Sequence, residues 1–362
     1  VTERLRPEQI VHLPHVLYHW RRHPGSTTMG QSVKPYAAGA ATRAIEDHLR
    51  RRQTPGAVRE LGRLGLQSVR WELPAQLPLV SIVVPTKDSE LALRCLQSVV
   101  SHTTYPSYEV LVVDNGARDT EAIERLAGSD LPIRLLRDDR PFNFSALNNR
   151  AVGQARGEVV CLLNDDTEVL TGDWLEEMVA QLAQPGVGVV GAKLYYPDGR
   201  LQHVGVVLGL SGGKGPGIAG HAFVGADRNF YGYSGNTVVP RRPSAVTAAC
   251  MCTRRQVWDE LGGLDEDNLA VSFNDVDYCL RARAAGWAVV WTPWAGLIHH
   301  ESVSRGDDFA PDNLPRSRRE TRFMLERWGD LLQNDPAYNP NLTLETPDYG
   351  LAWPPRRRPW WA

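Results

Sequence analysis

Apolar and polar positions alternate in blocks through the middle of the chain. Residues 79–86 (LVSIVVPT) are almost wholly apolar, which is typical of a strand buried on both faces of a sheet. The next block, 89–103, spaces its apolar residues at helical intervals and predicts an amphipathic helix. The alternation continues, with strands expected at 108–116, 133–139 and 158–166 and helices at 119–128 and 144–157. Such alternation predicts a parallel sheet whose strands are joined by right-handed crossovers.

Each of the four expected strands ends in polar residues. The polar ends are residues 85–88, 114–115, 137–140 and 164–166. Ligands of open α/β sheets bind beyond the carboxyl ends of the strands, and the ends of parallel strands meet at one edge. The sequence therefore predicts a ligand site on one polar rim of the sheet.

The pattern is different outside this region. Residues 188–210 predict a β-hairpin with a Pro-Asp-Gly turn, and residues 317–332 predict a helix. The glycine-rich stretch 208–221 lacks the surroundings of a phosphate-binding or dinucleotide-binding loop, so we expect a mobile loop or a lid over a substrate. Residues 1–70 are polar, rich in arginine and partly helical, with helical spacing over 41–52.

The composition narrows the class of protein. A chain of 362 residues, 42% hydrophobic and 23% charged, is expected to form two globular domains or one extended α/β domain. A net charge of −2 argues against a nucleic-acid-binding protein. The five cysteines are expected to be buried and reduced, since Cys250 and Cys252 lack the spacing of a zinc or redox pair. We expect no signal peptide, and the sequence has no apolar run near the ~18 residues of a membrane span, so we expect a cytoplasmic protein.

The fourth strand ends in the adjacent carboxylates Asp165 and Asp166, preceded by Asn164. Two neighbouring negative charges repel, and a divalent cation that bridges a carboxylate and a diphosphate would remove the repulsion. Mg²⁺ or Mn²⁺ suits such a site because both prefer oxygen ligands. The alternative is a helix cap, in which Asp166 or Thr167 accepts hydrogen bonds from the turn that follows.

Two further clusters downstream carry candidate chemistry. Residues 271–287 place Asp275 and Asp277 at the start of an expected helix. The helix dipole favours acidic residues there, and the functional alternative is a general base beside an acceptor hydroxyl. Two adjacent histidines, His299 and His300, follow an apolar strand and are either metal ligands or polar strand-end residues.

Aromatic residues raise two more alternatives. Trp287, Trp291 and Trp294 either pack against the sheet or form a platform on which an acceptor sugar stacks. The chain ends in RRRPWWA, which either contacts a membrane surface or is disordered.

Several motifs occur in order along residues 79–306, and together they resemble family-2 glycosyltransferases of the GT-A fold. The similarity is to the bacterial branch linked to cell-surface polysaccharide synthesis and often to rhamnosyl transfer. The segments that carry it include SIVVPTKD, VVDNG, RPFNFSALNN, LLNDDTEV, AVTAACM, FNDVDYCLR and HHESVSRG. The resemblance implies an α/β fold with a Rossmann-like, mostly parallel sheet flanked by helices. We expect an N-terminal extension at 1–75, the GT-A domain at 76–306 and a C-terminal helix and tail at 307–362.

The resemblance implies a role for each matching residue. The nucleotide pocket would be formed by Pro85, Thr86, Asp88, Asp114, Asn149 and Asp165. Asp114 would accept a hydrogen bond from the pyrimidine N3–H, and Asp165 would contact the ribose. The metal would be bound by Asp166 and His299, with His300 less favoured, and Asp275 would be the catalytic base. The residues expected around the acceptor or behind the ligands are Asp277, Trp287 and His300.

The resemblance also implies an activity. We expect a metal-dependent inverting transfer from a UDP- or dTDP-sugar, with Mn²⁺ or Mg²⁺, to a hydroxyl of a glycan or lipid-linked acceptor. No Gln-x-x-Arg-Trp motif of processive members is present, so one or a few sugars would be added. One alternative is a catalytically inactive nucleotide-sugar-binding scaffold. Another is a nucleotidyltransferase, which would normally carry a glycine-rich basic loop that PTKDSEL lacks.

The N-terminal region carries a second resemblance. Residues 9–28 resemble the closing segment of another glycosyltransferase domain, and the residues after them resemble a linker. We therefore expect this chain to be a piece of a longer tandem protein, with other such domains as partners. A peripheral contact with the inner face of the cytoplasmic membrane is a further expectation.

Overall fold

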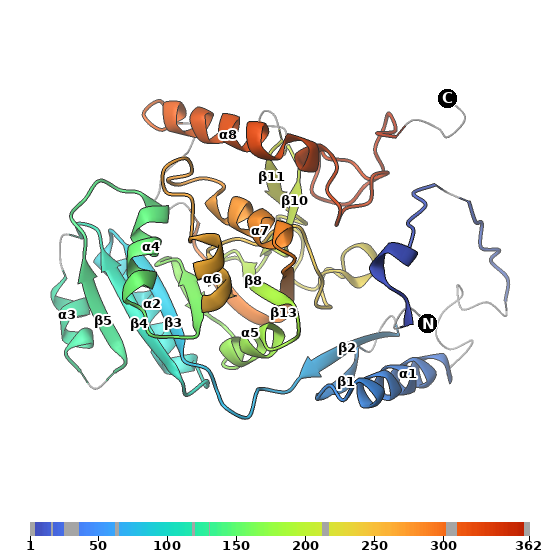
Figure 1. Ribbon diagram of the computed structural model, residues 1–362, viewed down its shortest axis with the longest axis horizontal. Helices are drawn as coiled ribbons and strands as arrows, with labels where there is room; N and C mark the ends of the chain where they lie inside the picture. The colour runs from blue at the N-terminus through green and yellow to red at the C-terminus, as the bar shows by residue number, and fades with distance from the viewer. Residues whose placement is uncertain are drawn as a thin grey trace.

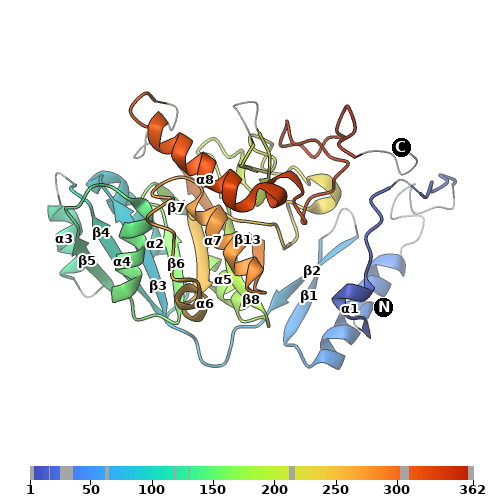
Figure 2. The same ribbon diagram turned by 45° about the horizontal axis from the view of Figure 1, so that its top comes forward.

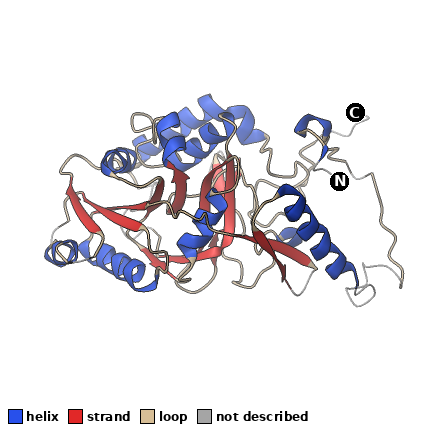
Figure 3. Ribbon diagram, turned by 60° about the horizontal axis from the view of Figure 1, so that its bottom comes forward, coloured by secondary structure: helices blue, strands red, loops and turns tan. Residues whose placement is uncertain are grey.

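The computed structural model describes residues 4–15, 17–24, 36–61, 65–117, 120–129, 131–211, 217–301 and 310–357. Its centre is a nine-stranded mixed sheet in the order β5-β4-β3-β6-β12-β8-β13-β7, with β9 paired to β8 (Figure 1). Helices cover both faces of this sheet (Figure 3). The predicted α/β architecture is therefore confirmed.

One half of the sheet follows the predicted alternation closely. Its strands are β3 (Val80–Thr86), β4 (Tyr108–Asp114), β5 (Ile133–Arg137) and β6 (Val159–Leu163). They alternate with the helices α2 (Ser89–His102), α3 (Glu121–Ala127) and α4 (Phe144–Gln154). All four strands are parallel, as expected. Side-chain caps begin two of the helices, since Asp88 accepts from the backbone of α2 and Asn143 from that of α4.

The other half of the sheet has mixed directions. Its strands are β7 (Thr167–Val169), β8 (Val187–Tyr195), β9 (Leu201–His203), β12 (Cys250–Arg254) and β13 (Ala288–His299). β12 is antiparallel to both β6 and β8, whereas β13 is parallel to β8. The predicted hairpin is confirmed as β8 and β9, and Gly199 at its turn has φ 85°, which a residue with a side chain rarely adopts.

A small second sheet lies beyond the hairpin. It pairs β10 (Val206–Leu208) with β11 (Ala219–His221) in antiparallel register. Of the glycine-rich stretch 208–221, expected to be a mobile loop or lid, residues 212–216 lie outside the described residues and Ala219–His221 form β11. A short 3₁₀ turn, η5 (Tyr233–Gly235), lies in the segment that leads to β12.

The remaining helices complete the two faces. They are α5 (Trp174–Leu182), α6 (Arg255–Leu261), α7 (Asn274–Ala284) and α8 (Leu314–Gln333). Buried residues of α2 and α5 share one core, whereas buried residues of α4, α6 and α7 share the core on the opposite face. α8 lies over α7 on the outside of this second layer, as Figures 1 and 2 both show.

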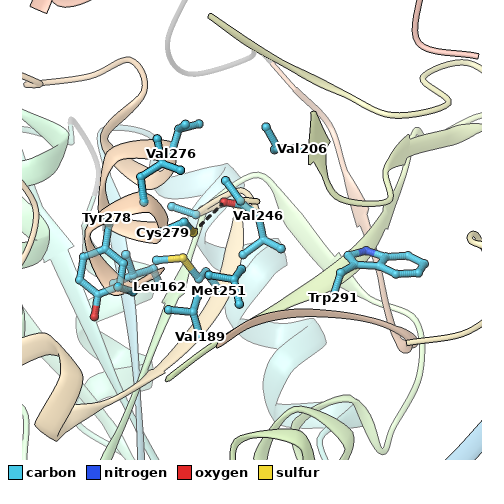
Figure 4. Close-up of a cluster of buried hydrophobic side chains, with 14 of the residues drawn as sticks. Leu162, Val189, Val206, Val246, Met251, Val276, Tyr278, Cys279 and Trp291 are labelled. Carbon is cyan, nitrogen blue, oxygen red and sulfur yellow. Dashed lines mark hydrogen bonds between the residues drawn. The ribbon is translucent and has the colours of Figure 1, made fainter. Parts of the chain in front are cut away.

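The second core is drawn in Figure 4, where Tyr278 and Cys279 of α7 meet Leu162, Val189 and Met251 of three strands. The Cys279 thiol donates to the carbonyl of Val246, 3.8 Å away. All five cysteines are buried and free, which confirms the prediction of reduced thiols. Among the residues that the structure describes, no helix is both long and apolar enough to span a bilayer.

The N-terminal region contains more structure than expected. After a short 3₁₀ turn, η2 (Pro7–Gln9), come α1 (Tyr36–Arg52) and an antiparallel hairpin of β1 (Gly56–Leu61) and β2 (Leu66–Trp71). The helix was predicted, but the hairpin was not. Arg70 attaches the hairpin to α5 through Asp173 at 2.8 Å and Glu177 at 3.0 Å. Of the C-terminal tail expected to contact a membrane, residues 358–362 lie outside the described part of the chain.

Candidate active site

The carboxyl ends of the parallel strands meet along one rim, as the sequence predicted. The backbone N–H of Asn115 donates to the carbonyl of Thr86 at 2.8 Å, and that of Asp138 donates to the carbonyl of Asp114 at 2.8 Å. These bonds continue the sheet ladder beyond the strand ends. The polar residues after β3, β4 and β5 are thereby held side by side.

A cavity of about 130 Å³ opens at this rim. Its lining comes from both halves of the sheet and includes Pro85, Thr86, Lys87, Phe142, Asn164, Asp165, Ala248, Val271, Phe273 and Asp275. Thr86 donates its hydroxyl to Asp165 Oδ2 at 2.7 Å. Burial, together with the nearby Asp166 and Asp88, raises the pKa of Asp165 to about 7, against the opposing effect of the Thr86 bond. Asp165 can therefore carry a proton near neutrality and hydrogen-bond a hydroxyl.

Asp88 and Asp114 lie beside this cavity, although neither is among its lining residues. The Asp88 carboxylate accepts the N–H groups of Glu90 and Leu91 and so caps α2. One oxygen of Asp114 accepts the N–H of Ala117 at 2.7 Å. Its other oxygen, Oδ2, is buried without a hydrogen-bond partner and lies 3.5 Å from Arg137 Nε. That oxygen is the part of Asp114 still able to accept a donor from a ligand.

Asp166 and His299 face each other across the β7–β13 pairing, where His299 is the register partner of Thr167. Asp166 Oδ1 lies 3.1 Å from His299 Nε2 and is buried without a hydrogen-bond partner. Burial raises the pKa of Asp166, whereas a protonated His299, a backbone hydrogen bond and His300 lower it, and together they hold that pKa below its usual range. The helix-cap alternative does not apply, because Asp173 and not Asp166 precedes α5.

Gln202 determines which nitrogen of His299 is available. The Gln202 amide nitrogen donates to the carbonyl of His299 at 3.1 Å and to Glu301 Oε2 at 3.2 Å. Its amide oxygen therefore faces His299 Nδ1 at 2.7 Å and must accept a proton from it. In the neutral ring this leaves a lone pair on Nε2, which lies 3.1 Å from Asp166 Oδ1 and 3.3 Å from the amide nitrogen of Asn164. A metal-binding histidine is held in the same manner by an outer hydrogen bond.

The donor set of Asp166 and His299 fits a divalent cation. Two acceptors 3.1 Å apart, one of them a buried carboxylate oxygen with no donor, are stabilised by a positive ion between them. Within the described ranges, no three His, Cys, Asp or Glu side chains are arranged to hold a metal ion. Two protein ligands leave most coordination positions to phosphate and water, which suits Mg²⁺ or Mn²⁺ bound with a diphosphate.

A second cavity, of about 250 Å³, adjoins the first. It is lined by residues that include Asn164, Asp166, Val206, His221, Thr247, Phe273, Asp275, His299 and Glu301. Asn164, Thr247, Phe273 and Asp275 line both cavities, so the two are neighbours. Burial lowers the pKa of His221, whose Nδ1 lies 3.1 Å from the carbonyl of Gln202. A neutral imidazole in this wall suits a polar uncharged ligand.

Asp275 stands at the N-terminus of α7, between the two cavities. Its Oδ2 accepts the N–H of Ala248 at 3.0 Å, and its Oδ1 accepts the N–H of Val276 at 2.8 Å. The residue before the helix, Phe273, has φ 63°, which aims the chain sharply into α7. Asp275 therefore lies at the start of a helix and also lines the cavities. The two alternatives for this residue, a helix-start position and a general base, are compatible with each other.

Four candidates from the sequence lie away from the cavities. Asn149 binds the backbone of Leu264 through both ends of its amide and Glu266 Oε2 at 2.7 Å. Asp277 is wholly buried between Arg281 and Trp328 of α8. Asn149 lines a separate cavity with Asp265 and Arg327, and neither residue lines the two cavities at the rim.

The other two are Trp287 and His300. Trp287 follows α7 and donates its indole N–H to Glu260 at 3.0 Å, and His300 Nε2 lies 2.7 Å from Glu168. Trp291 is fully buried, and Trp294 lies under Arg59 of the N-terminal hairpin. None of the three tryptophans lines either cavity, so in the structure they pack against the sheet and its surroundings.

Gln202 and Glu301 belong to the site although sequence inspection did not single them out. Gln202 lies in the three-residue strand β9, buried, and is separated from His299 by 97 residues in the sequence. A glutamine in a short strand looks like an ordinary polar surface residue. Glu301 directly follows the His299–His300 pair, and its acidity was the one available signal.

The chain is similar to known proteins. Residues 81–253 match the family model for Glycosyl transferase family 2. Protein y4gI of Sinorhizobium fredii is 48% identical over 97% of this chain and 39% of its own length. The O-antigen biosynthesis protein RfbC of Myxococcus xanthus is 37% identical over 97% of this chain and 26% of its own length. The chain thus spans between a quarter and two fifths of these relatives.

A solved structure supports the fold. The crystal structure of GalNAc-T7 with UDP, GalNAc and Mn²⁺ superposes with a TM-score of 0.55 at 14% identity, covering 71% of this chain and 50% of that one. At this identity the likeness concerns the fold. The expected GT-A fold is thereby confirmed.

Proposed function

We propose that the chain transfers a sugar from a nucleotide diphosphate donor to a hydroxyl, since residues 81–253 match the family model for Glycosyl transferase family 2. The observation that carries the proposal is the arrangement of Asp166, His299 and Asp275. The first two face each other at 3.1 Å, and Asp275 shares a cavity wall with both. The acceptor is a glycan or a lipid-linked sugar of a bacterial surface polysaccharide, the class of product named for RfbC.

The donor is a UDP- or dTDP-sugar that occupies the first cavity. Thr86 and Asp165 are bonded at 2.7 Å in its wall, and Asp165 hydrogen-bonds the ribose. Asp114 keeps one buried oxygen without a hydrogen-bond partner and accepts from the pyrimidine N3–H. Pro85, at the end of β3, lines the same cavity, and Asp88 orders the turn that follows.

The metal is Mn²⁺ or Mg²⁺, held by Asp166 and His299. When bound, such an ion neutralises the charge that develops on the departing diphosphate. Asp166 supplies a carboxylate oxygen and His299 its Nε2, while Gln202 keeps the proton on Nδ1. Asp166 and His299 would not need to move during the reaction, so the metal site is preorganised.

The reaction is an inverting displacement. The acceptor hydroxyl oxygen attacks the anomeric carbon, the bond from that carbon to the phosphate oxygen breaks, and Asp275 takes the hydroxyl proton. The electron pair of the broken bond leaves with the diphosphate. Asp275 is fixed for this step by the N–H of Ala248 at 3.0 Å. A protein nucleophile is not required, and transfer is of one or a few sugars per acceptor.

Nucleotide binding by the chain tests this function directly. Titration calorimetry with UDP, dTDP and GDP, each with and without Mn²⁺, should show pyrimidine diphosphates binding more tightly when the metal is present. Release of UDP or dTDP from the matching sugar nucleotides, measured in the presence of acceptor glycolipids, should then identify the donor. Metal-dependent binding without any turnover would favour the inactive scaffold, and no binding of any diphosphate would overturn the proposal.

The cellular setting follows from the relatives. Since RfbC and y4gI extend well beyond the region they share with this chain, we propose that the domain works beside further domains or partner glycosyltransferases. Donor sugar nucleotides of this kind are cytoplasmic compounds, so the reaction belongs on the cytoplasmic side of the membrane. Co-purification of a second glycosyltransferase activity with the tagged natural protein would support this arrangement.

A further inference from the structure

α8 contacts the active-site loop through Glu320 and through Arg316, whose Nη1 donates to the Ser272 hydroxyl oxygen at 3.2 Å. Glu320, 1% exposed, lies on the side of α8 that faces α7. Its Oε1 accepts the backbone N–H of Val271 at 3.0 Å, and its Oε2 accepts that of Ser272 at 3.2 Å. Both oxygens are thus directed at consecutive backbone donors of one loop. α8 lies outside the region matched by the family model, which ends at residue 253.

The loop that Glu320 holds forms a wall of both cavities. Val271 lines the first cavity, Ser272 the second, and Phe273 lines both. Phe273 has φ 63° and directly precedes α7, so the backbone reverses here within one residue. Asp275 comes two residues later. Only Phe273 and Asn274, the first residue of α7, separate Ser272 from Asp275. A displacement of the backbone at residues 271–272 should therefore also displace Asp275.

The loop is held from two sides. On the α4 side, the N–H of Ser145 donates to the carbonyl of Ala270 at 3.2 Å. On the α8 side, Arg316 lies 2.7 Å from Glu320 Oε2, so the buried charge is balanced. A buried carboxylate is costly, and packing alone would be served as well by an apolar side chain. The carboxylate, unlike an apolar side chain, accepts hydrogen bonds from two backbone N–H groups of the loop.

The same helix contacts α7 again about two turns farther along. Trp328 donates its indole N–H to Asp277 Oδ1 at 2.9 Å, and Arg327 lies 3.3 Å from that oxygen. Asp277 also binds Arg281 at 2.7 Å. The first turn of α7 is therefore fixed on both sides of Asp275, by Glu320 before it and by the Asp277 cluster after it.

We propose that Glu320 is a positioning residue for sugar transfer, which holds the 271–273 loop so that the Asp275 carboxylate faces the acceptor hydroxyl. This inference rests on the proposed function of Asp275 as the base. Glu320 itself touches no substrate. Its loss should reduce kcat because misplacement of a reacting group by about 1 Å can cost on the order of 100-fold in rate.

Amide hydrogen exchange tests the hydrogen bonds between Glu320 and the loop without any substrate. Hydrogen–deuterium exchange of the whole chain should speed up at Val271 and Ser272 in Glu320→Ala, and less in Glu320→Gln, which keeps one acceptor oxygen. Glu326→Ala is the matched control, since Glu326 is an exposed glutamate of the same helix. Unchanged exchange at Val271 and Ser272 in Glu320→Ala would overturn the proposal. If Glu320→Ala does not fold, Glu320→Gln carries both this test and the next.

Kinetics tests the positioning role. With the sugar nucleotide that the wild-type chain turns over, we expect Glu320→Ala to lower kcat about 10- to 100-fold while the Kd for UDP with Mn²⁺ changes less than about 3-fold. In the Asp275→Asn background the same change should cost less than about 2-fold, because a missing base cannot be misplaced. Equal losses in both backgrounds, or full kcat in Glu320→Ala, would overturn the inference. A wild-type chain without transfer activity would instead contradict the proposed function.

Discussion

The two halves of the sheet bring residues to the site by different routes. In the half formed by β5, β4, β3 and β6, the chain runs strand, helix, strand, and each functional residue simply ends its own strand. In the half formed by β12, β8, β13 and β7, the strands interleave out of order. There, functional residues are held by contacts between distant segments, such as Gln202 with His299, 97 residues apart.

In the proposed function, this difference separates donor binding from catalysis. The proposed donor contacts come mainly from strand ends of the first half, with Thr86 and Asp165 in the cavity wall. The proposed base, the proposed histidine ligand and their supports come from the second half and from α8. Substitutions in the second half should therefore lower kcat or the affinity for the metal ion. They should leave the binding of the nucleotide without metal unchanged. The predictions below test this separation.

The largest effect is expected from Asp275→Asn. The amide cannot take the acceptor proton, so kcat should fall roughly 10²- to 10⁴-fold, the range for loss of a general base. The Kd for UDP with Mn²⁺ should stay near the wild-type value, since the proposed nucleotide contacts are made by Thr86, Asp114 and Asp165. Steady-state kinetics and calorimetry measure the two quantities. Asp267→Asn, an exposed aspartate before the same helix, is the control. Near-full turnover in the Asp275→Asn variant would show that Asp275 is not the general base.

The next effect concerns the metal. Asp166→Ala removes one of two protein ligands, and the affinity for Mn²⁺ with UDP should fall on the order of 100-fold or more, since even outer partners of such ligands matter 10- to 100-fold. Binding of UDP without metal should remain as weak as in the wild type. Calorimetry with and without Mn²⁺ separates the two, with exposed Asp47→Ala as control. If Mn²⁺ strengthens UDP binding equally in both proteins, the cation lies elsewhere.

The strand-end residues of the first half could be read from the sequence for a physical reason. A buried strand needs a continuous apolar run, so the first polar residue marks where it leaves the core. Parallel neighbours then bring these points together without further information. This is why Thr86, Asp114 and Asp165 were predicted at one rim and lie there.

The supports of the second half could not be read in that way. Gln202 and Glu320 look like surface residues in a short strand and an amphipathic helix, and their importance comes only from tertiary contacts. At Asn149 the resemblance suggested a nucleotide contact, and in the structure its amide binds Leu264 and Glu266. The hairpin β1–β2 was missed because charged residues interrupt its apolar alternation, as at Arg59 and Glu60.

A smaller effect is expected from Gln202→Leu. This variant tests whether a residue of the second half of the sheet supports the proposed metal ligand His299. Without the amide oxygen at 2.7 Å, the Nδ1 proton of His299 loses its acceptor, and the ring is free to turn or change tautomer. Loss of such an outer partner typically costs 10- to 100-fold in metal affinity. Mn²⁺ titration followed by activity measures it, and Gln97→Leu on the exposed side of α2 is the control. Unaltered Mn²⁺ dependence would show that His299 needs no support from β9.

The smallest effect is expected outside both halves, at the contact of the N-terminal hairpin with α5. Arg70→Ala removes ion pairs with half-exposed Asp173 and with buried Glu177, and should lower the free energy of unfolding by about 1 kcal/mol. Burial raises the pKa of Glu177, and Arg70 opposes that rise, so the variant raises this pKa further.

The loss caused by Arg70→Ala should therefore be full at pH 7 and shrink as the pH falls through the raised pKa of Glu177, because a protonated carboxyl needs no cation. Urea unfolding at several pH values measures it, and Arg94→Ala, which breaks a solvent-exposed pair with Glu90 on α2, is the control. α5 packs on the face of the sheet opposite α7, so kcat should not change. A fall in kcat beyond about 2-fold at unchanged folding would mean that the hairpin is coupled to the base through the sheet, and the separation drawn between the regions would fail.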